Sequence, residues 1–493
     1  MTSRRRRGKS ARPNCPRRWP RACSKANEKQ RMRTGTIIAG FTLGPKLHQG
    51  GMAVLHEATH PDHSLPMLMK LPLLTEGQDP AAIVGFEMEQ MILPRLEGPH
   101  VPRCIAMGHE PLPWIVMERV RGETLLPLFD RLPLPIAEVV ETGALVAEAL
   151  CALHRQGVVH LDVKPGNIMR VDGDCGARVV LLDFGLSHHA LLPDLMAEEF
   201  RLPYGSAPYM APEQLMGIRG DPASDLFGLA AMLYAMSTGR NPFGDPQHMS
   251  HMKRRLWWDP PPPRALRPDC PPWLQEIILR NLEIEPGRRH PTAAQMAFDL
   301  RHPEQVSQTP RAGKLKRDPW GARIRRRFHP DHQPRLKRNA IAMAQSGAPI
   351  IMVAVDTAVT AAELCTAMRR MVTQIMATLP GARVACVNVL QTHLLRPDMT
   401  LDEEGRNKHL QRLLELRHWS AELKLPEARL THHVLEAVDP ADALLEYARL
   451  NRADHIILGA SESSLGRRVL GSVSGQVARD APCSVTVVRL RPG

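Results

Sequence analysis

The stretch from residue 303 to residue 346 contains many proline and basic residues but little apolar periodicity, and it divides the chain into two parts. Such a composition is typical of a linker. The 493 residues are also too many for one hydrophobic core, so more than one domain is expected. We therefore predict a disordered basic extension at 1–35, a folded domain at 36–302, the linker at 303–346 and a second folded domain at 347–493.

The formal net charge of +13 is confined to two tracts of the chain. Residues 1–35 contain 13 lysines and arginines against one acid, Glu28, and residues 301–340 contain 12 against three acids, so the rest carries −8. Basic tracts without apolar periodicity are usually solvated, and we interpret these two as a tail and a linker. Docking to an acidic partner, a membrane surface or nucleic acid stays open. Because Met32 directly precedes the first folded pattern, we rest no function on residues 1–31.

The nine cysteines are scattered and form no CxxC pair. This indicates a reduced, cytoplasmic protein with buried thiols, and not a disulfide framework or a zinc site. No run approaches the roughly 18 apolar residues that a membrane span needs. The basic N-terminus also lacks the apolar segment of a signal peptide. We therefore predict a cytoplasmic protein without a membrane span.

The first folded domain has two kinds of pattern. Short β-like runs and one helix candidate, 81–96, occupy residues 36–130. Longer helical segments such as 135–157 and 222–239 follow between residues 133 and 300. This order predicts a small β-rich lobe followed by a larger helical lobe, which is an α+β architecture.

The second folded domain alternates strictly between short apolar runs and helical segments. We expect strands at 349–356, 382–390, 428–437, 454–460 and 484–490, and helices at 360–378, 402–423, 441–453 and 472–480. This alternation predicts an α/β fold with a doubly wound parallel sheet. Ligands of such sheets bind at the carboxyl ends of the strands, near the switch in strand order.

The most specific signal is the pair of segments HLDVKPGNIM, with Asp162, Lys164 and Asn167, and LLDFGL, with Asp183. Phosphoryl transfer needs an acceptor for the proton of the substrate hydroxyl, oxygen ligands for Mg²⁺, and cations near the transferred phosphoryl group. Asp162 can accept the proton and Lys164 can reach the γ-phosphate. Asn167 and Asp183 can hold the metal ions.

In these two segments the chain resembles the eukaryotic-like (Hanks-type) serine/threonine protein kinase family, over about residues 36–300. The resemblance implies the bilobal protein kinase fold and binding of ATP and Mg²⁺. It implies that Lys70 neutralises the α- and β-phosphates and that Glu89 pairs with Lys70. It also implies that Met117 is the gatekeeper and that the backbone of 118–120 faces the adenine.

The same resemblance assigns three supporting residues. Glu213 is expected to pair with Arg289, and Asp225 is expected to anchor the catalytic loop. Lys164 implies specificity for serine and threonine over tyrosine.

The glycine-rich loop departs from the family pattern G-x-G-x-x-G-x-V. The aligned residues are His48, Gly50, Ala53 and Leu55, with Gly51 as an additional glycine. The backbone at the two glycines keeps the freedom to approach phosphates. We expect ATP to bind here, at Gly50, Gly51 and Leu55, with reduced affinity.

A second departure is Leu161, which stands where most members of the family have arginine before the catalytic aspartate. That arginine holds a phosphorylated residue of the activation loop, which leucine cannot do. The hydroxyl residues available between Asp183 and Glu213 are Ser187, Tyr204, Ser206 and Tyr209. We therefore expect activity without phosphorylation of the activation loop.

The C-terminal segment that begins ILGASESSLG resembles the end of the universal stress protein family. Its ATP-binding members carry a glycine-rich phosphate loop before a helix, whose N-terminus favours anions. Gly459, Gly471 and Ser472 match this loop, whereas Glu462 replaces its second glycine. Asp356 matches the nucleotide-contacting aspartate of the first strand. Nucleotide binding, homodimer formation and a regulatory role without ligand all stay open.

Three functions of different classes follow from these patterns. The first is a serine/threonine protein kinase whose C-terminal domain regulates it, senses nucleotide or forms a homodimer. The alternative is a pseudokinase signalling scaffold, suggested by the altered glycine loop, although the key polar residues are complete: Lys70, Glu89, Asp162, Asn167 and Asp183. A nucleic-acid-associated protein is not expected, because the basic tracts lack interleaved aromatic residues and a recognition motif.

Overall fold

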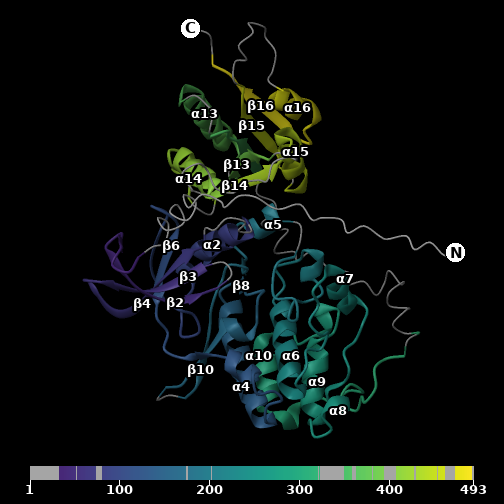
Figure 1. The fold of residues 1–493 in the computed structure, drawn as a ribbon. Helices are drawn as coiled ribbons and strands as arrows, with labels where there is room; N and C mark the ends of the chain where they lie inside the picture. Colours follow the sequence, from purple (N-terminus) through teal and green to yellow (C-terminus); the bar gives the residue numbers. More distant parts are fainter. Residues whose placement is uncertain are drawn as a thin grey trace, which may run out of the picture.

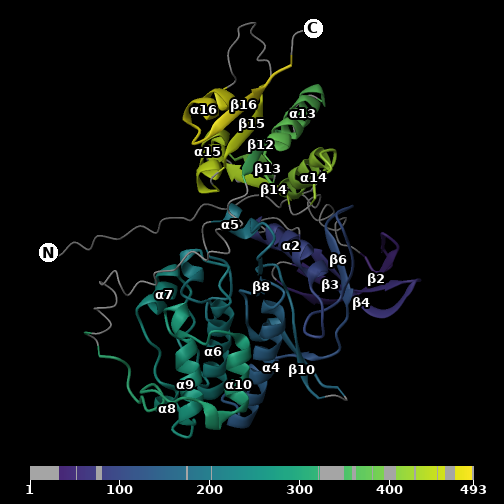
Figure 2. The same ribbon diagram turned by 180° about the vertical axis from the view of Figure 1, so that it is seen from behind.

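The computed structural model describes residues 33–50, 53–73, 80–173, 176–200, 203–319, 321, 349–357, 362–379, 381–392, 407–426, 429–451, 453–460 and 472–490. The chain folds into a small β-rich lobe, a larger helical lobe and a C-terminal α/β domain. The C-terminal domain stands above the other two in Figure 1, and Figure 2 shows the same arrangement from behind. In these ranges no helix combines the length and the apolar character that crossing a membrane requires. The described cysteines are all free thiols.

The small lobe is a six-stranded sheet in the order β1-β2-β3-β4-β6-β5, and the pairs are antiparallel. Its strands are β1 (Ile37–Ile38), β2 (Phe41–Gln49), β3 (Ala53–His60), β4 (His63–Pro72), β5 (Cys104–Gly108) and β6 (Trp114–Glu118). Leu43, Met69 and Val116 are fully buried between strands and form part of its core. The predicted helix 81–96 is observed as α2 (Pro80–Ile92), followed by the 3₁₀ turn η1 (Leu93–Arg95).

The large lobe is helical, as predicted. Its α-helices are α3 (Leu126–Phe129), α4 (Ile136–His154), α5 (Leu195–Glu199), α6 (Ala223–Thr238), α7 (Met249–Met252), α8 (Pro263–Leu266), α9 (Pro272–Asn281) and α10 (Ala293–Arg301). Short strands lie at β7 (Glu123–Thr124), β8 (Val158–Val159), β9 (Ile168–Val171), β10 (Arg178–Leu181) and β11 (His188–His189). Its 3₁₀ turns are η2 (Pro165–Asn167), η3 (Gln214–Met216), η4 (Lys253–Leu256), η5 (Pro286–Arg288) and η6 (Pro303–Gln305).

Helices α4 and α6 pack against each other in the core of the large lobe. A Cβ atom on Gly143 of α4 would stand only 2.6 Å from a methyl group of Leu233 on α6. The absence of a side chain at this position therefore lets the two helices approach closely.

The first part of the expected linker is not a solvated linker, because it packs on the large lobe. Residues 303–318 pack on the large lobe, where Gln275 Nε2 donates to the carbonyl oxygens of Arg311 (2.7 Å) and Lys314 (2.9 Å). Arg311 also pairs with Glu276 at 3.1 Å. Arg311 and Lys314, two of the basic residues that suggested a solvated linker, are here neutralised by acids of the lobe, and composition alone does not reveal such pairing.

The C-terminal domain has the predicted parallel sheet, in the strand order β14-β13-β12-β15-β16. Its strands are β12 (Ile350–Ala354), β13 (Arg383–Gln391), β14 (Leu430–Ala437), β15 (His455–Gly459) and β16 (Ser484–Val488). Its helices are α13 (Ala362–Thr378), α14 (Lys408–Ala421), α15 (Pro440–Leu450) and α16 (Ser472–Asp480). Alternate strand residues pack in two separate clusters, one with α13 and α14 and one with α15 and α16, so helices cover both faces.

Candidate active site

Asp162 lies in the loop between β8 and η2 and is held by three donors. Its Oδ2 atom accepts hydrogen bonds from Lys164 Nζ at 2.6 Å and Asn167 Nδ2 at 2.9 Å. Its Oδ1 atom accepts one from the backbone N–H of Ser206 at 3.0 Å. The predicted residues Asp162, Lys164 and Asn167 are thus brought together, and these hydrogen bonds fix the orientation of the Asp162 carboxylate.

Asp225, at the start of α6, holds the loop that carries Asp162. Its carboxylate is buried and accepts the backbone N–H groups of His160 and Leu161, each at 2.8 Å. His154 Nε2 lies 2.8 Å from the same carboxylate. The predicted anchoring contact is therefore present, whereas the contact with His154 had no signal in the sequence.

Lys70 on β4 connects the small lobe to both predicted acids. Its Nζ pairs with the Glu89 carboxylate of α2, and it lies 3.0 Å from Asp183 Oδ1. Desolvation would lower the pKa of Lys70, but the charges of Asp183 and Glu89 outweigh it and raise that pKa above its usual value. Desolvation likewise opposes ionisation of Asp183, and the charge and hydrogen bond of Lys70 lower its pKa to about 2. Lys70 is therefore a cation and Asp183 an anion at neutral pH.

Asn167 and Asp183 offer the oxygen ligands that Mg²⁺ prefers. The Asp183 side chain is 47% exposed, and it is ionised. The Asn167 amide donates through Nδ2 to Asp162, which leaves its oxygen as the group that can coordinate a cation. No cluster of three or more metal-binding side chains occurs among the described residues. Two protein ligands suit a Mg²⁺ ion that takes its other ligands from phosphate and water.

Two other predicted nucleotide-binding residues of the kinase region lie on strands next to Lys70. Leu55 on β3 pairs directly with Lys70 across the sheet. Met117 on β6 is buried and pairs with Leu68 of β4. Gly50 follows the end of β2, and Gly51 lies outside the described residues.

Leu161, which stands before Asp162, has a buried side chain. Its side chain is 4% exposed, its φ is +65°, and its carbonyl accepts a hydrogen bond from Gln214 Nε2 at 2.8 Å. Ser187 is also fully buried and donates its hydroxyl to the carbonyl oxygen of His160 at 3.1 Å. Burial raises the pKa of Tyr209 to about 12. Gln214 was not predicted as a site residue, although it stands in the segment APEQ.

The predicted pair of Glu213 and Arg289 is confirmed. The side chains are fully buried and form two hydrogen bonds of 2.6 and 2.8 Å. Ser224 donates its hydroxyl to the same carboxylate at 2.6 Å. This pair ties the end of the activation segment to the turn before α10.

In the C-terminal domain, the structure describes three of the residues predicted to bind nucleotide: Asp356, Gly459 and Ser472. Asp356 follows β12 and is exposed, and Gly459 ends the neighbouring strand β15. These strand ends flank the switch in strand order, where ligands of such sheets bind. Ser472 is the first residue of α16. Gly471 and Glu462 lie outside the described residues.

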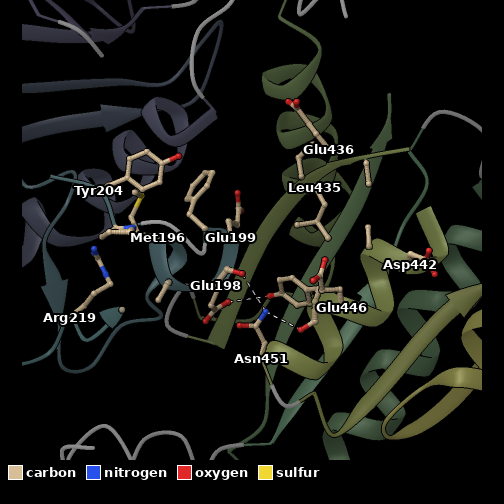
Figure 3. Close-up of a pocket in the computed structure, with 18 of the residues that line it drawn as sticks. Met196, Glu198, Glu199, Tyr204, Arg219, Leu435, Glu436, Asp442, Glu446 and Asn451 are labelled. Atoms are coloured by element: carbon tan, nitrogen blue, oxygen red, sulfur yellow. Dashed lines mark hydrogen bonds between the residues drawn. The ribbon is translucent and has the colours of Figure 1, made fainter. Parts of the chain in front are cut away.

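A cavity of about 800 Å³ lies between the large lobe and the C-terminal domain, and not at Lys70 or Asp162. Figure 3 shows α5 on one side of it and β14 and α15 on the other. Its walls include Glu199, Tyr204, Arg219, Glu436 and Asp442. The cavity borders the activation segment, because Tyr204 is two residues before Ser206, whose N–H binds Asp162.

Comparisons with known proteins also divide the chain into two regions, which correspond to the kinase-like lobes and the C-terminal domain. Residues 41–299 match the family model described as the protein kinase domain, and residues 348–489 match that of the universal stress protein family. The kinase match covers more than half of the chain.

Several characterised proteins are similar to the first of these regions. Serine/threonine-protein kinase PknB of Mycolicibacterium smegmatis is 30% identical over 266 residues, which are 53% of this chain and 42% of that protein. Serine/threonine-protein kinase PknL of Mycobacterium bovis is 28% identical over 278 residues, which are 56% of this chain and 68% of that protein. The crystal structure of the Mycobacterium tuberculosis PknI kinase domain has 26% identity and a TM-score of 0.44, and covers 55% of this chain and 99% of that one. The chain spans less than half the length of the PknB relative.

Proposed function

The chain belongs to the protein kinase family. We propose that it is a serine/threonine protein kinase that uses ATP and Mg²⁺. The observation that carries the proposal is the arrangement around Asp162. This carboxylate accepts hydrogen bonds from Lys164, Asn167 and the backbone of Ser206. It is therefore oriented to accept the proton of a substrate hydroxyl.

The remaining polar residues have distinct roles in this proposal. Lys70, held between Glu89 and Asp183, would bind the α- and β-phosphates of ATP. Lys164 would place its positive charge at the γ-phosphate. Asn167 and Asp183 would hold Mg²⁺, which neutralises phosphate charge when bound. Specificity for serine and threonine is supported by Lys164 and by the names of the similar proteins.

We assign the C-terminal domain a regulatory role in the same cytoplasmic protein. Asp356 and Gly459 lie at neighbouring strand ends, which supports binding of a nucleotide there. Homodimer formation through this domain stays an alternative to nucleotide sensing.

The competing function is a pseudokinase scaffold that binds nucleotide without efficient transfer. The replacement of two loop glycines by His48 and Ala53 favours it. The ion pairs of Lys70 oppose it, because they leave the phosphate-binding lysine charged and oriented.

Transfer of labelled phosphate from Mg-ATP by the full chain, to itself and to a generic basic protein, tests the proposal. We expect transfer that disappears in both Asp162→Asn and Asp183→Ala. Absence of transfer in the unaltered chain, with ATP still raising its melting temperature, would instead support the scaffold.

A further inference from the structure

The C-terminal domain contacts two elements of the kinase region that matter for phosphoryl transfer. In Figures 1 and 2, α2 and α5 lie at the boundary between the kinase lobes and the C-terminal domain. Helix α2 carries Glu89, the partner of Lys70, and α5 lies in the activation segment between Asp183 and Glu213. The two helices also contact each other.

The contact with α2 is made by Arg417 on α14. Its Nε donates to Glu87 Oε1 at 3.0 Å, and Nη2 binds the same oxygen. Its Nη1 lies 3.0 Å from His109 Nε2, which follows β5. Desolvation and the nearby Arg417 charge lower the pKa of His109 to about 4, so this ring is neutral and accepts the hydrogen bond. Glu87 is 2% exposed, so Arg417 neutralises a carboxylate that has little contact with water.

Apolar packing adds to this contact. Ile83 of α2 is 2% exposed and belongs to the same buried cluster as Leu413 and Leu416 of α14. One helix of the kinase region is therefore part of a core of the C-terminal domain. Burial of such a side chain stabilises the docked arrangement.

Helix α2 is consequently held from two sides. Glu87 and Glu89 are two residues apart, and side chains at that spacing point to different sides of a helix. Glu89 points to Lys70 in the small lobe, and Glu87 points to Arg417 in the C-terminal domain. Rotation or withdrawal of α2 would break both ion pairs.

The contact with α5 is a buried group of charges around His433 on β14. The two ring nitrogens of His433 face acids of α5, with Nε2 at 3.0 Å from Glu198 and Nδ1 at 2.9 Å from Glu199. Glu198 also pairs with Arg383 at 2.6 Å and accepts the hydroxyl of Tyr447 at 3.2 Å. Figure 3 shows Glu198 facing α15 across the domain boundary. A ring with a carboxylate at each nitrogen donates to both, so His433 is a buried imidazolium.

We propose that the C-terminal domain positions the kinase region in cis: Arg417 and His433 are positioning residues that hold α2 and α5 where Lys70 pairs with Glu89. This inference rests on the proposed kinase function. It gives the C-terminal domain a defined task, which is to stabilise the arrangement in which the phosphate-binding lysine and Asp183 are correctly placed.

The test compares Arg417→Gln with Arg412→Gln in the full chain. Both residues lie on α14, but Arg412 pairs with Glu415 inside its own domain at 2.7 Å. The first readout is hydrogen exchange of the α2 and α5 amides. We expect Arg417→Gln to accelerate exchange in α2 about tenfold, as loss of a charged hydrogen bond would. We expect Arg412→Gln to leave α2 unchanged.

The second readout is kcat for phosphoryl transfer, corrected for the folded fraction. We expect Arg417→Gln to lower kcat about tenfold, with a smaller change in KM for ATP. Arg417→Lys should restore part of the loss. Combining Arg417→Gln with Glu87→Gln should cost less than the sum of the single variants. His433→Gln should accelerate exchange in α5.

The outcomes separate the two proposals. Equal exchange and equal kcat in Arg417→Gln and Arg412→Gln would overturn the positioning role. If the unaltered chain transfers no phosphate, the kinase proposal fails, and α2 exchange in the same two variants still decides whether Arg417 positions that helix.

Discussion

Raising the pH should weaken the contact between the C-terminal domain and α5, because His433 must lose its proton. Burial alone would lower the pKa of His433, but its hydrogen bonds to Glu198 and Glu199 and the charges of both carboxylates raise it to about 9. The pKa of the unfolded chain is the ordinary 6.5. Folding therefore takes up a proton between these two values. The stabilisation is complete below pH 6.5 and is lost as the pH rises through 9.

The size of the effect follows from the difference of about 2.5 between the two pKa values. At roughly 1.4 kcal/mol per tenfold change in proton affinity, this is on the order of 3 kcal/mol. Solvent does not screen this interaction, because the His433 side chain is fully buried. Desolvation opposes ionisation of Glu198, but His433 and Arg383 lower its pKa to about 2, and this shift reflects the same contact with His433.

Glu198, Tyr447 and His432, which lie around His433, do not titrate between pH 6.5 and 9. Glu198 is already ionised, and burial raises the pKa of Tyr447 well above 10. Desolvation keeps the pKa of the neighbouring His432 well below 6.5. Glu199 also faces the ring, and burial raises its pKa from 4.5 while His433 opposes that change.

Urea unfolding of the unaltered chain and of His433→Gln at pH 6.5, 7.5, 8.5 and 9.5 measures this contribution. Glutamine imitates the neutral ring, so the difference in unfolding free energy should be about 3 kcal/mol at pH 6.5 and near zero at pH 9.5. His455→Gln is the control, because desolvation lowers the pKa of His455, so this ring takes up no proton on folding. A difference for His433→Gln that stays constant over the range would refute the reasoning.

Three further changes have clear expected outcomes. Arg289→Ala leaves Glu213 buried without its cation, so the full chain should lose about 3–5 kcal/mol of stability in urea unfolding, and an unchanged midpoint would contradict this. Gly85→Ala places a Cβ atom 3.3 Å from the Gly185 carbonyl oxygen of the Asp-Phe-Gly segment. Because alanine otherwise favours helix, we expect retained folding but a lower kcat, and an unchanged kcat would count against close packing of α2 on that segment. Ser187→Ala should keep most phosphoryl transfer, since this buried hydroxyl is not available for phosphorylation, and complete loss would be evidence against activity without activation-loop phosphorylation.

Local patterns in the sequence predicted most elements of the fold. Helix α16 was expected at 472–480 and has those bounds, and the other strands and helices of the C-terminal domain differ by up to six residues at their ends. The largest difference is at the start of α14, where the expected residues 402–406 lie outside the described residues. Apolar periodicity and helix-ending residues are local properties, so they survive without tertiary information. The order of these elements was sufficient to predict a parallel sheet.

The chemistry of the catalytic loop was also readable from the sequence. Asp162, Lys164 and Asn167 lie within six consecutive residues, and a short loop of that kind brings them together. The pairing of Lys70 with Glu89 was inferred from resemblance, and the structure has that ion pair.

The contacts between the two domains could not be predicted from the sequence. Arg417 and Glu87 are 330 positions apart, and each is an ordinary charged residue in its own helix. A sequence pattern does not distinguish a solvated arginine from one that neutralises a buried carboxylate, because the difference lies in which distant surface covers it. The burial of Ser187 and the packing of residues 303–318 on the large lobe have the same origin. Local sequence patterns were therefore sufficient for the elements and for the candidate catalytic residues. Long-range packing determined which charges are buried and paired, because those contacts join residues that are far apart in the sequence.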